Sequence, residues 1–162
     1  GLQAGKTGNS EAGHMNIGAG RVVLQDDVRL DQAMKDGSFA ANPVFRQTLT
    51  EVLKKKTRLH LIGLLTEKSS HGSIDYPLAL NQLAQEMGLP EVYVHLILDG
   101  RSTEPGSAPA LLEKLEVLLG PESPAQVVTA IGRGIALDRD GNYSKIKTAD
   151  EAMVKGFGTV YS

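Results

Sequence analysis

The segment Leu59-His60-Leu61-Ile62-Gly63-Leu64-Leu65 decides the fold, because it is a nearly continuous run of apolar residues. Such a run is typical of a strand that is covered on both faces of a parallel sheet. Two similar runs follow at 92–98 and 126–131, each beginning about 33 residues after the one before. The sequence therefore predicts three strands that recur at a regular interval.

Helical patterns fill the intervals between these runs. Asn42-Pro43 opens one helix, a second spans about 75–87, and leucines at helical spacing mark a third over 111–119. We also expect an extended segment at 22–30 and a short last helix opened by a capping box at 148–151. The alternation predicts an α/β fold, mainly a parallel sheet with helices on both faces in three layers, as an incomplete domain.

Polar loops follow the three predicted strands and carry His71, Arg101 and Arg133, with Arg139 a little further on. Ligands of open parallel sheets bind beyond the carboxyl ends of the strands, so these side chains should meet at one edge. Arginine binds carboxylates and phosphates through two parallel hydrogen bonds. The sequence thus predicts a site for a small anion that carries such groups.

The residues alone leave several alternatives open. His71 could be a plain loop residue, and the segment 138–140 around Arg139 could be only a surface turn. His60 and His95 lie within apolar strands, where a histidine is more often a hydrogen-bonded internal or interface group than a ligand.

The first twenty residues contain six glycines, and one hydroxyl residue, Ser10, lies in the middle of this segment. Glycine packs nothing and loses backbone entropy on ordering, so this density marks tight turns or a close approach to a ligand. Asn9 or Ser10 could cap a following helical turn, where a phosphate would be stabilised. A capped loop without any ligand is the other interpretation.

Composition excludes several classes of protein. The chain has 162 residues, a formal net charge of −2 and no cysteine, so it lacks the charge of a nucleic-acid-binding domain, disulfides and thiolate metal sites. No apolar run approaches the roughly 20 residues of a membrane span, and no secretory signal is visible. Because the chain begins at Gly1 without Met, we expect a piece of a longer protein.

Four segments together resemble the cofactor-independent (2,3-bisphosphoglycerate-independent) phosphoglycerate mutases, relatives of alkaline phosphatase. The first is Gly8-Asn9-Ser10-Glu11-Ala12-Gly13-His14-Met15-Asn16-Ile17-Gly18-Ala19-Gly20-Arg21, which resembles the signature of that family. The others are Gly63-Leu64-Leu65 with His71, then Leu98-Asp99-Gly100-Arg101, and Gly132-Arg133 with Asp138-Arg139-Asp140.

The resemblance implies a cytoplasmic isomerase of glycolysis and gluconeogenesis that interconverts 3-phosphoglycerate and 2-phosphoglycerate through a phosphoserine intermediate. Ser10 would be the nucleophile and a ligand of two Mn²⁺ ions. The substrate would be held by His71, Arg101, Ser102, Arg133 and Arg139. Residues 1–24 would belong to the metal-binding phosphatase-like domain, and 25–162 to a phosphotransferase domain truncated at its C-terminal end.

The same resemblance implies a monomeric full-length enzyme without nucleic-acid or membrane partners. The other metal ligands of the family have no counterpart here, so we expect no complete manganese site and no activity from this chain alone.

Ser102 stands where the family usually has Asp, and a Ser hydroxyl does not readily accept a proton near neutral pH. A non-catalytic α/β module that binds a phosphorylated metabolite is the alternative function.

Overall fold

The structure is a computed structural model that describes residues 10–67, 69 and 71–160. The chain forms two compact units, residues 1–46 and 47–162, and the boundary falls within helix α3 (Pro43–Lys55). Helix α3 begins where it was predicted, because the Asn42 side chain accepts a hydrogen bond of 2.9 Å from the backbone N–H of Val44.

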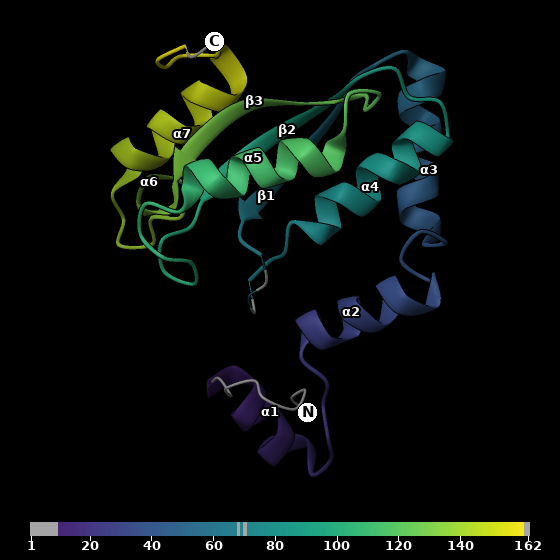
Figure 1. The fold of residues 1–162 in the computed structure, drawn as a ribbon. Helices are drawn as coiled ribbons and strands as arrows, with labels where there is room; N and C mark the ends of the chain where they lie inside the picture. The colour runs from purple at the N-terminus through teal and green to yellow at the C-terminus, as the bar shows by residue number, and fades with distance from the viewer. Residues whose placement is uncertain (1–9, 68, 70, 161–162) are drawn as a thin grey trace. The chain divides into compact units, whose positions relative to one another are not determined.

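The second unit is built on a three-stranded sheet in the order β1-β2-β3, and both pairs of strands are parallel (Figure 1). The strands are β1 (Leu59–Leu65), β2 (Val92–Leu98) and β3 (Ala125–Gly132). All three were predicted within one residue at each end. The carboxyl ends of the strands therefore lie along one edge of the sheet.

Helices cover both faces of this sheet, as predicted. Helices α4 (Asp75–Glu86) and α5 (Ala108–Leu119) pack on one face, and α6 (Arg133–Ala136) and α7 (Tyr143–Lys155) pack against β3 (Figure 1). The core beneath α4 and α5 consists of Leu65, Ile74, Val94, Leu96, Leu111 and Leu115. Burying one such aliphatic side chain stabilises the fold by about 1.5–3 kcal/mol, so this layer holds α4 and α5 against the sheet.

A bulge between β2 and β3 changes which side chains share a face. Val94 pairs with Val127 but His95 pairs with Thr129, so Val128 is an extra residue in β3. As a result Thr129 lies beside His95, with 2.8 Å between Thr129 Oγ1 and His95 Nδ1. His95 Nε2 lies 2.9 Å from His60 Nδ1. His95 is thus the hydrogen-bonded internal histidine that was predicted, whereas His60 is exposed.

The first unit contains α1 (Ser10–Ala19) and α2 (Asp26–Asp36). The prediction of an extended segment at 22–30 was wrong, because a helix begins at Asp26. Asp26 and Asp27 occupy its first turn, where carboxylates favour the helix dipole, and Gly37 ends it in the left-handed conformation with φ +79°. Of the predicted segment, only residues 22–25 lie outside a helix, as a connection between α1 and α2.

The prediction that the last helix begins at a capping box at Thr148 was also wrong. Helix α7 begins five residues earlier, at Tyr143, and the Thr148 hydroxyl donates to the carbonyl of Ser144 inside the helix. The start of the helix is set instead by Asp138, whose carboxylate accepts from the backbone and side-chain N–H groups of Asn142.

Candidate anion-binding site

Four of the predicted residues line one cavity of about 650 Å³ at the carboxyl edge of the sheet: His71, Arg101, Arg133 and Arg139. We call it the arginine cavity. These residues come from the loops that follow β1, β2 and β3, so they are far apart in the sequence. Their convergence, predicted from the parallel topology, is confirmed.

The arginine cavity has mainly positively charged side chains on its walls and apolar side chains at its base. Besides the three arginines, Lys145 of α7 lines it, against two carboxylates, Asp138 and Asp140. Ile62, Leu64 and Ile97 lie on the sheet face that α4 and α5 leave free, and they form the apolar base. Four positive charges facing two negative charges attract a small anion. Lys145 was not predicted.

The β1 loop brings His71 to this cavity through a tight turn. The backbone N–H of Ser69 donates to the carbonyl of Gly72 at 2.9 Å, and the N–H of His71 donates to the Ser69 hydroxyl at 3.2 Å. A Cβ atom at Gly72 would lie 3.3 Å from the Cβ of Leu64, so glycine lets the turn approach the end of β1 closely. The His71 side chain is exposed at the tip.

The β2 loop is held by Asp99, the residue that follows the strand. Its carboxylate accepts from the backbone N–H groups of Arg101 at 3.0 Å and Ser102 at 3.3 Å, and from Arg133 Nη1 at 2.6 Å. Burial by itself raises the pKa of Asp99. The hydrogen bond and charge of Arg133 and the two backbone N–H groups outweigh burial and hold the pKa below its ordinary value.

The β3 loop is held in a similar way by Asp138, whose side chain is only 4% exposed. Hydrogen bonds from Asn142, and then the neighbouring Lys145, lower the pKa of Asp138. The Nζ atom of Lys145 lies 3.3 Å from Asp138 Oδ1. Asp138 thereby fixes the loop that carries Arg139. Neither Asp99 nor Asp138 was predicted to hold a loop. For Asp99 the sequence carries a signal, because an Asp followed by Gly at a strand end favours a side-chain-capped turn.

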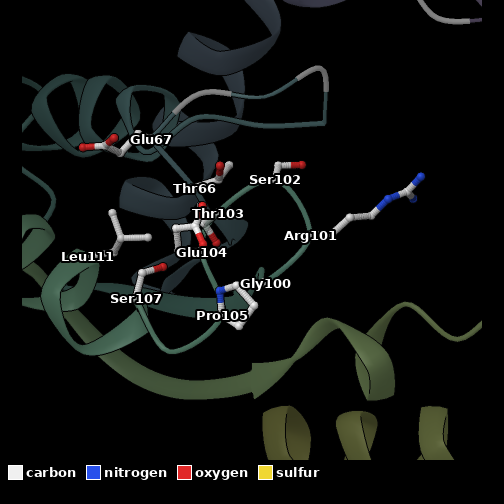
Figure 2. A pocket seen from close by; sticks show the side chains of 10 residues that line it. All are labelled: Thr66, Glu67, Gly100, Arg101, Ser102, Thr103, Glu104, Pro105, Ser107 and Leu111. Carbon is white, nitrogen blue, oxygen red and sulfur yellow. The ribbon is translucent and has the colours of Figure 1, made fainter.

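Ser102, the fifth predicted residue, does not line the arginine cavity. It lines a neighbouring cavity of about 480 Å³ together with Thr66, Glu67, Glu104 and Ser107. Figure 2 shows this second cavity, in which the Arg101 side chain extends away from the other labelled side chains. Arg101 therefore lines both cavities, whereas Ser102 lines only the second one.

Ser10 is the first residue of α1 and is exposed in the first unit. The Nδ1 atom of His14 lies 2.7 Å from the Ser10 carbonyl, to which it donates, and 3.2 Å from Ser10 Oγ. Among the described residues no three His, Asp, Glu or Cys side chains gather in a way that could hold a metal ion. The residues described around Ser10 therefore do not fit a manganese site by themselves.

The described part of the chain also contains no helix that is long and apolar enough to cross a membrane. The structure thus defines the class of protein, an α/β domain whose parallel strands end at a cavity lined by arginines, side chains that suit carboxylate and phosphate groups.

Comparison with known proteins narrows this class to one family. Residues 30–162 match the family described as BPG-independent PGAM N-terminus, and the chain belongs to that family. A 2,3-bisphosphoglycerate-independent phosphoglycerate mutase of Myxococcus xanthus is 44% identical over 158 residues, which cover 98% of this chain and 31% of that protein. One from Acaryochloris marina is 44% identical over 154 residues, covering 95% of this chain and 29% of that protein.

A crystal structure of Leishmania mexicana phosphoglycerate mutase at low cobalt concentration has the same fold, with a TM-score of 0.84 and 31% sequence identity. The match covers 95% of this chain and 29% of that one. The chain thus spans about 30% of the length of the relatives that it matches.

Proposed function

We propose that this chain supplies the substrate-binding region of a 2,3-bisphosphoglycerate-independent phosphoglycerate mutase, which interconverts 3-phosphoglycerate and 2-phosphoglycerate. The observation that carries the proposal is the convergence of His71, Arg101, Arg133 and Arg139 on one cavity. Phosphoglycerate carries a carboxylate and a phosphate, and separate arginines can bind each of them in a bidentate manner. Membership of the family supports the same substrate.

In this proposal Ser10 is the phosphoryl acceptor. Residues 1–24 belong to the metal-binding domain and 25–162 to the phosphotransferase domain. The arginines hold glycerate while it turns, so that its second hydroxyl can accept the phosphoryl group from Ser10. These tasks are positioning and charge stabilisation, which make up most of the catalysis of phosphoryl transfer.

The metal belongs to the whole protein rather than to the described residues. Two Mn²⁺ ions would bind Ser10 together with ligands from the parts of the protein that this chain does not span. Ser102 lines the second cavity and carries no carboxylate, so it would not serve as a general base near neutral pH.

The test uses the full-length protein. Ser10→Ala should lower turnover of 3-phosphoglycerate by more than a thousandfold while leaving the thermal unfolding temperature and the affinity for 3-phosphoglycerate unchanged. Mass spectrometry of protein quenched during turnover should locate the phosphoryl group on Ser10. Retained turnover would exclude Ser10 as the acceptor. If the full-length protein binds 3-phosphoglycerate but never turns it over, the chain is part of a non-catalytic binding module.

A further inference from the structure

Asp99 stands behind the arginine cavity and does not line it. Its side chain is 0% exposed, whereas that of its partner Arg133 is 23% exposed and reaches the cavity. An isolated buried carboxylate is costly, so this one must be stabilised by the groups around it. Those groups are the Arg133 guanidinium and two backbone N–H groups of the β2 loop.

The geometry leaves most of the Arg133 guanidinium available to a ligand. A guanidinium carries five N–H donors in a rigid planar fork. Asp99 Oδ1 accepts from Nη1, and no other acceptor for Arg133 is found among the described residues. One anchored nitrogen fixes the plane of the group, and the remaining donors can face an anion in the cavity.

The same carboxylate also sets the path of the β2 loop. Oδ1 accepts from the N–H of Arg101 and Oδ2 from that of Ser102, which closes a side-chain-capped turn directly after the strand. Gly100 lies within this turn at φ +132°, a conformation that residues with a side chain rarely adopt. The direction in which Arg101 leaves the loop therefore depends on Asp99.

We propose that Asp99 is the positioning residue of the anion site, because it orients Arg133 and the Arg101 loop so that both arginines engage one anion. This inference rests on the proposed binding of phosphoglycerate. Asp99 itself touches no substrate and acts only through its neighbours. It couples two loops that are 34 positions apart in the sequence.

A double-mutant cycle tests this role by titrating 3-phosphoglycerate, by calorimetry, into the full-length protein that carries Ser10→Ala and therefore binds without turnover. Asp99→Asn keeps the shape but removes the charge and one acceptor, and it should raise the Kd about tenfold. In an Arg133→Gln background the same change should raise the Kd by a smaller factor, because only the Arg101 loop is then left for Asp99 to position. Glu91→Gln, which breaks an arginine–carboxylate pair at the other end of the strands, should leave the Kd unchanged.

An equal loss of affinity from Asp99→Asn in both backgrounds would overturn the inference, as would no loss in either. Side-chain ¹⁵N relaxation of the wild-type chain without ligand gives a second reading that does not require the variant to fold. The Nε–H group of Arg133 should be rigid, and that of the exposed Arg139 should be mobile. Equal mobility of the two would also overturn it.

The relaxation measurement separates this inference from the proposed function. If the full-length protein does not bind 3-phosphoglycerate, the proposed function fails at its binding step. A rigid Arg133 that becomes mobile in Asp99→Asn would still support the positioning role of Asp99. An Arg133 that stays rigid in Asp99→Asn would contradict that role.

Discussion

Two arginine–carboxylate pairs connect neighbouring loops at opposite ends of the same sheet, and they differ in burial. At the amino ends of the strands, Arg58 Nε lies 3.2 Å from Glu91 Oε2, and the two side chains are 63% and 51% exposed. At the carboxyl ends, Arg133 Nη1 lies 2.6 Å from Asp99 Oδ1, with exposures of 23% and 0%. Both pairs join a guanidinium to a carboxylate, so the difference in their burial comes from the residues that surround them.

The exposed pair contributes little, because water and salt screen its charges and two long side chains must be ordered to form it. The buried pair is expensive to form, since both charges lose water, and it is very sensitive to the loss of either partner. A buried pair with a fixed geometry is useful where a guanidinium must be held in one orientation toward a ligand. The carboxyl edge of the sheet, where ligands of parallel sheets bind, is that place.

The largest effect should come from truncating each carboxylate. Asp99→Ala leaves the Arg133 guanidinium partly buried without a counter-ion and frees two backbone N–H groups, so it should lower the free energy of unfolding by about 2–4 kcal/mol. Glu91→Ala should lower it by less than about 1 kcal/mol. Urea denaturation followed by circular dichroism measures both values. Equal losses would show that burial does not distinguish the pairs.

The sequence predicted well which residues meet at the carboxyl ends of the strands. Apolar runs identified the three strands, and parallel strands place the following loops at one edge, so the convergence of His71, Arg101, Arg133 and Arg139 followed from topology. The pairing of Asp99 with Arg133 did not follow. The pairing depends on the register of β2 against β3, which a bulge at Val128 shifts by one residue. The pattern of apolar residues in the sequence does not predict that bulge.

Helix starts were predicted less well than strands. A capping box at Thr148 is a valid local signal, but Asp138 begins α7 earlier through a contact with Asn142. The prediction that Ser102 binds substrate came from the resemblance, because Ser102 stands where the family usually has Asp. Adjacent residues in a turn point in different directions, and Ser102 lines the other cavity.

The second prediction compares how much Arg133 and Arg58 each contribute to binding of 3-phosphoglycerate. Arg133→Gln should weaken binding of 3-phosphoglycerate to the full-length protein about thirtyfold, since a charge-assisted pair of hydrogen bonds is lost. Arg58→Gln, at the opposite end of the sheet, should change the Kd less than twofold. Calorimetric titration at one fixed ionic strength provides both numbers. A similar loss in the two variants would mean that binding follows net charge and not the arginine cavity.

The third prediction concerns pH. The pKa of Asp99 in the folded chain lies below its ordinary value, chiefly because the Arg133 hydrogen bond and the backbone N–H groups outweigh burial. Its contribution to stability is therefore complete above about pH 5 and is lost as the pH falls below about 4, through the folded pKa. The stability advantage of the wild type over Asp99→Asn should shrink over that range in urea titrations. An advantage that stays constant down to pH 3 would contradict a depressed pKa.

The smallest effect should come from salt. Raising NaCl from about 0.05 M to 1 M shortens the Debye length from more than 10 Å to about 3 Å, which screens exposed charges but reaches buried pairs poorly. The stability difference between wild type and Glu91→Gln should therefore fall by a few tenths of a kcal/mol, towards zero. The difference between wild type and Asp99→Asn should stay within error, because Asp99 is shielded from solvent. Urea denaturation of the three proteins at both salt concentrations measures this. If salt instead reduced the Asp99 difference as much as the Glu91 difference, the carboxylate would be open to solvent, and it could not hold Arg133 in a fixed direction.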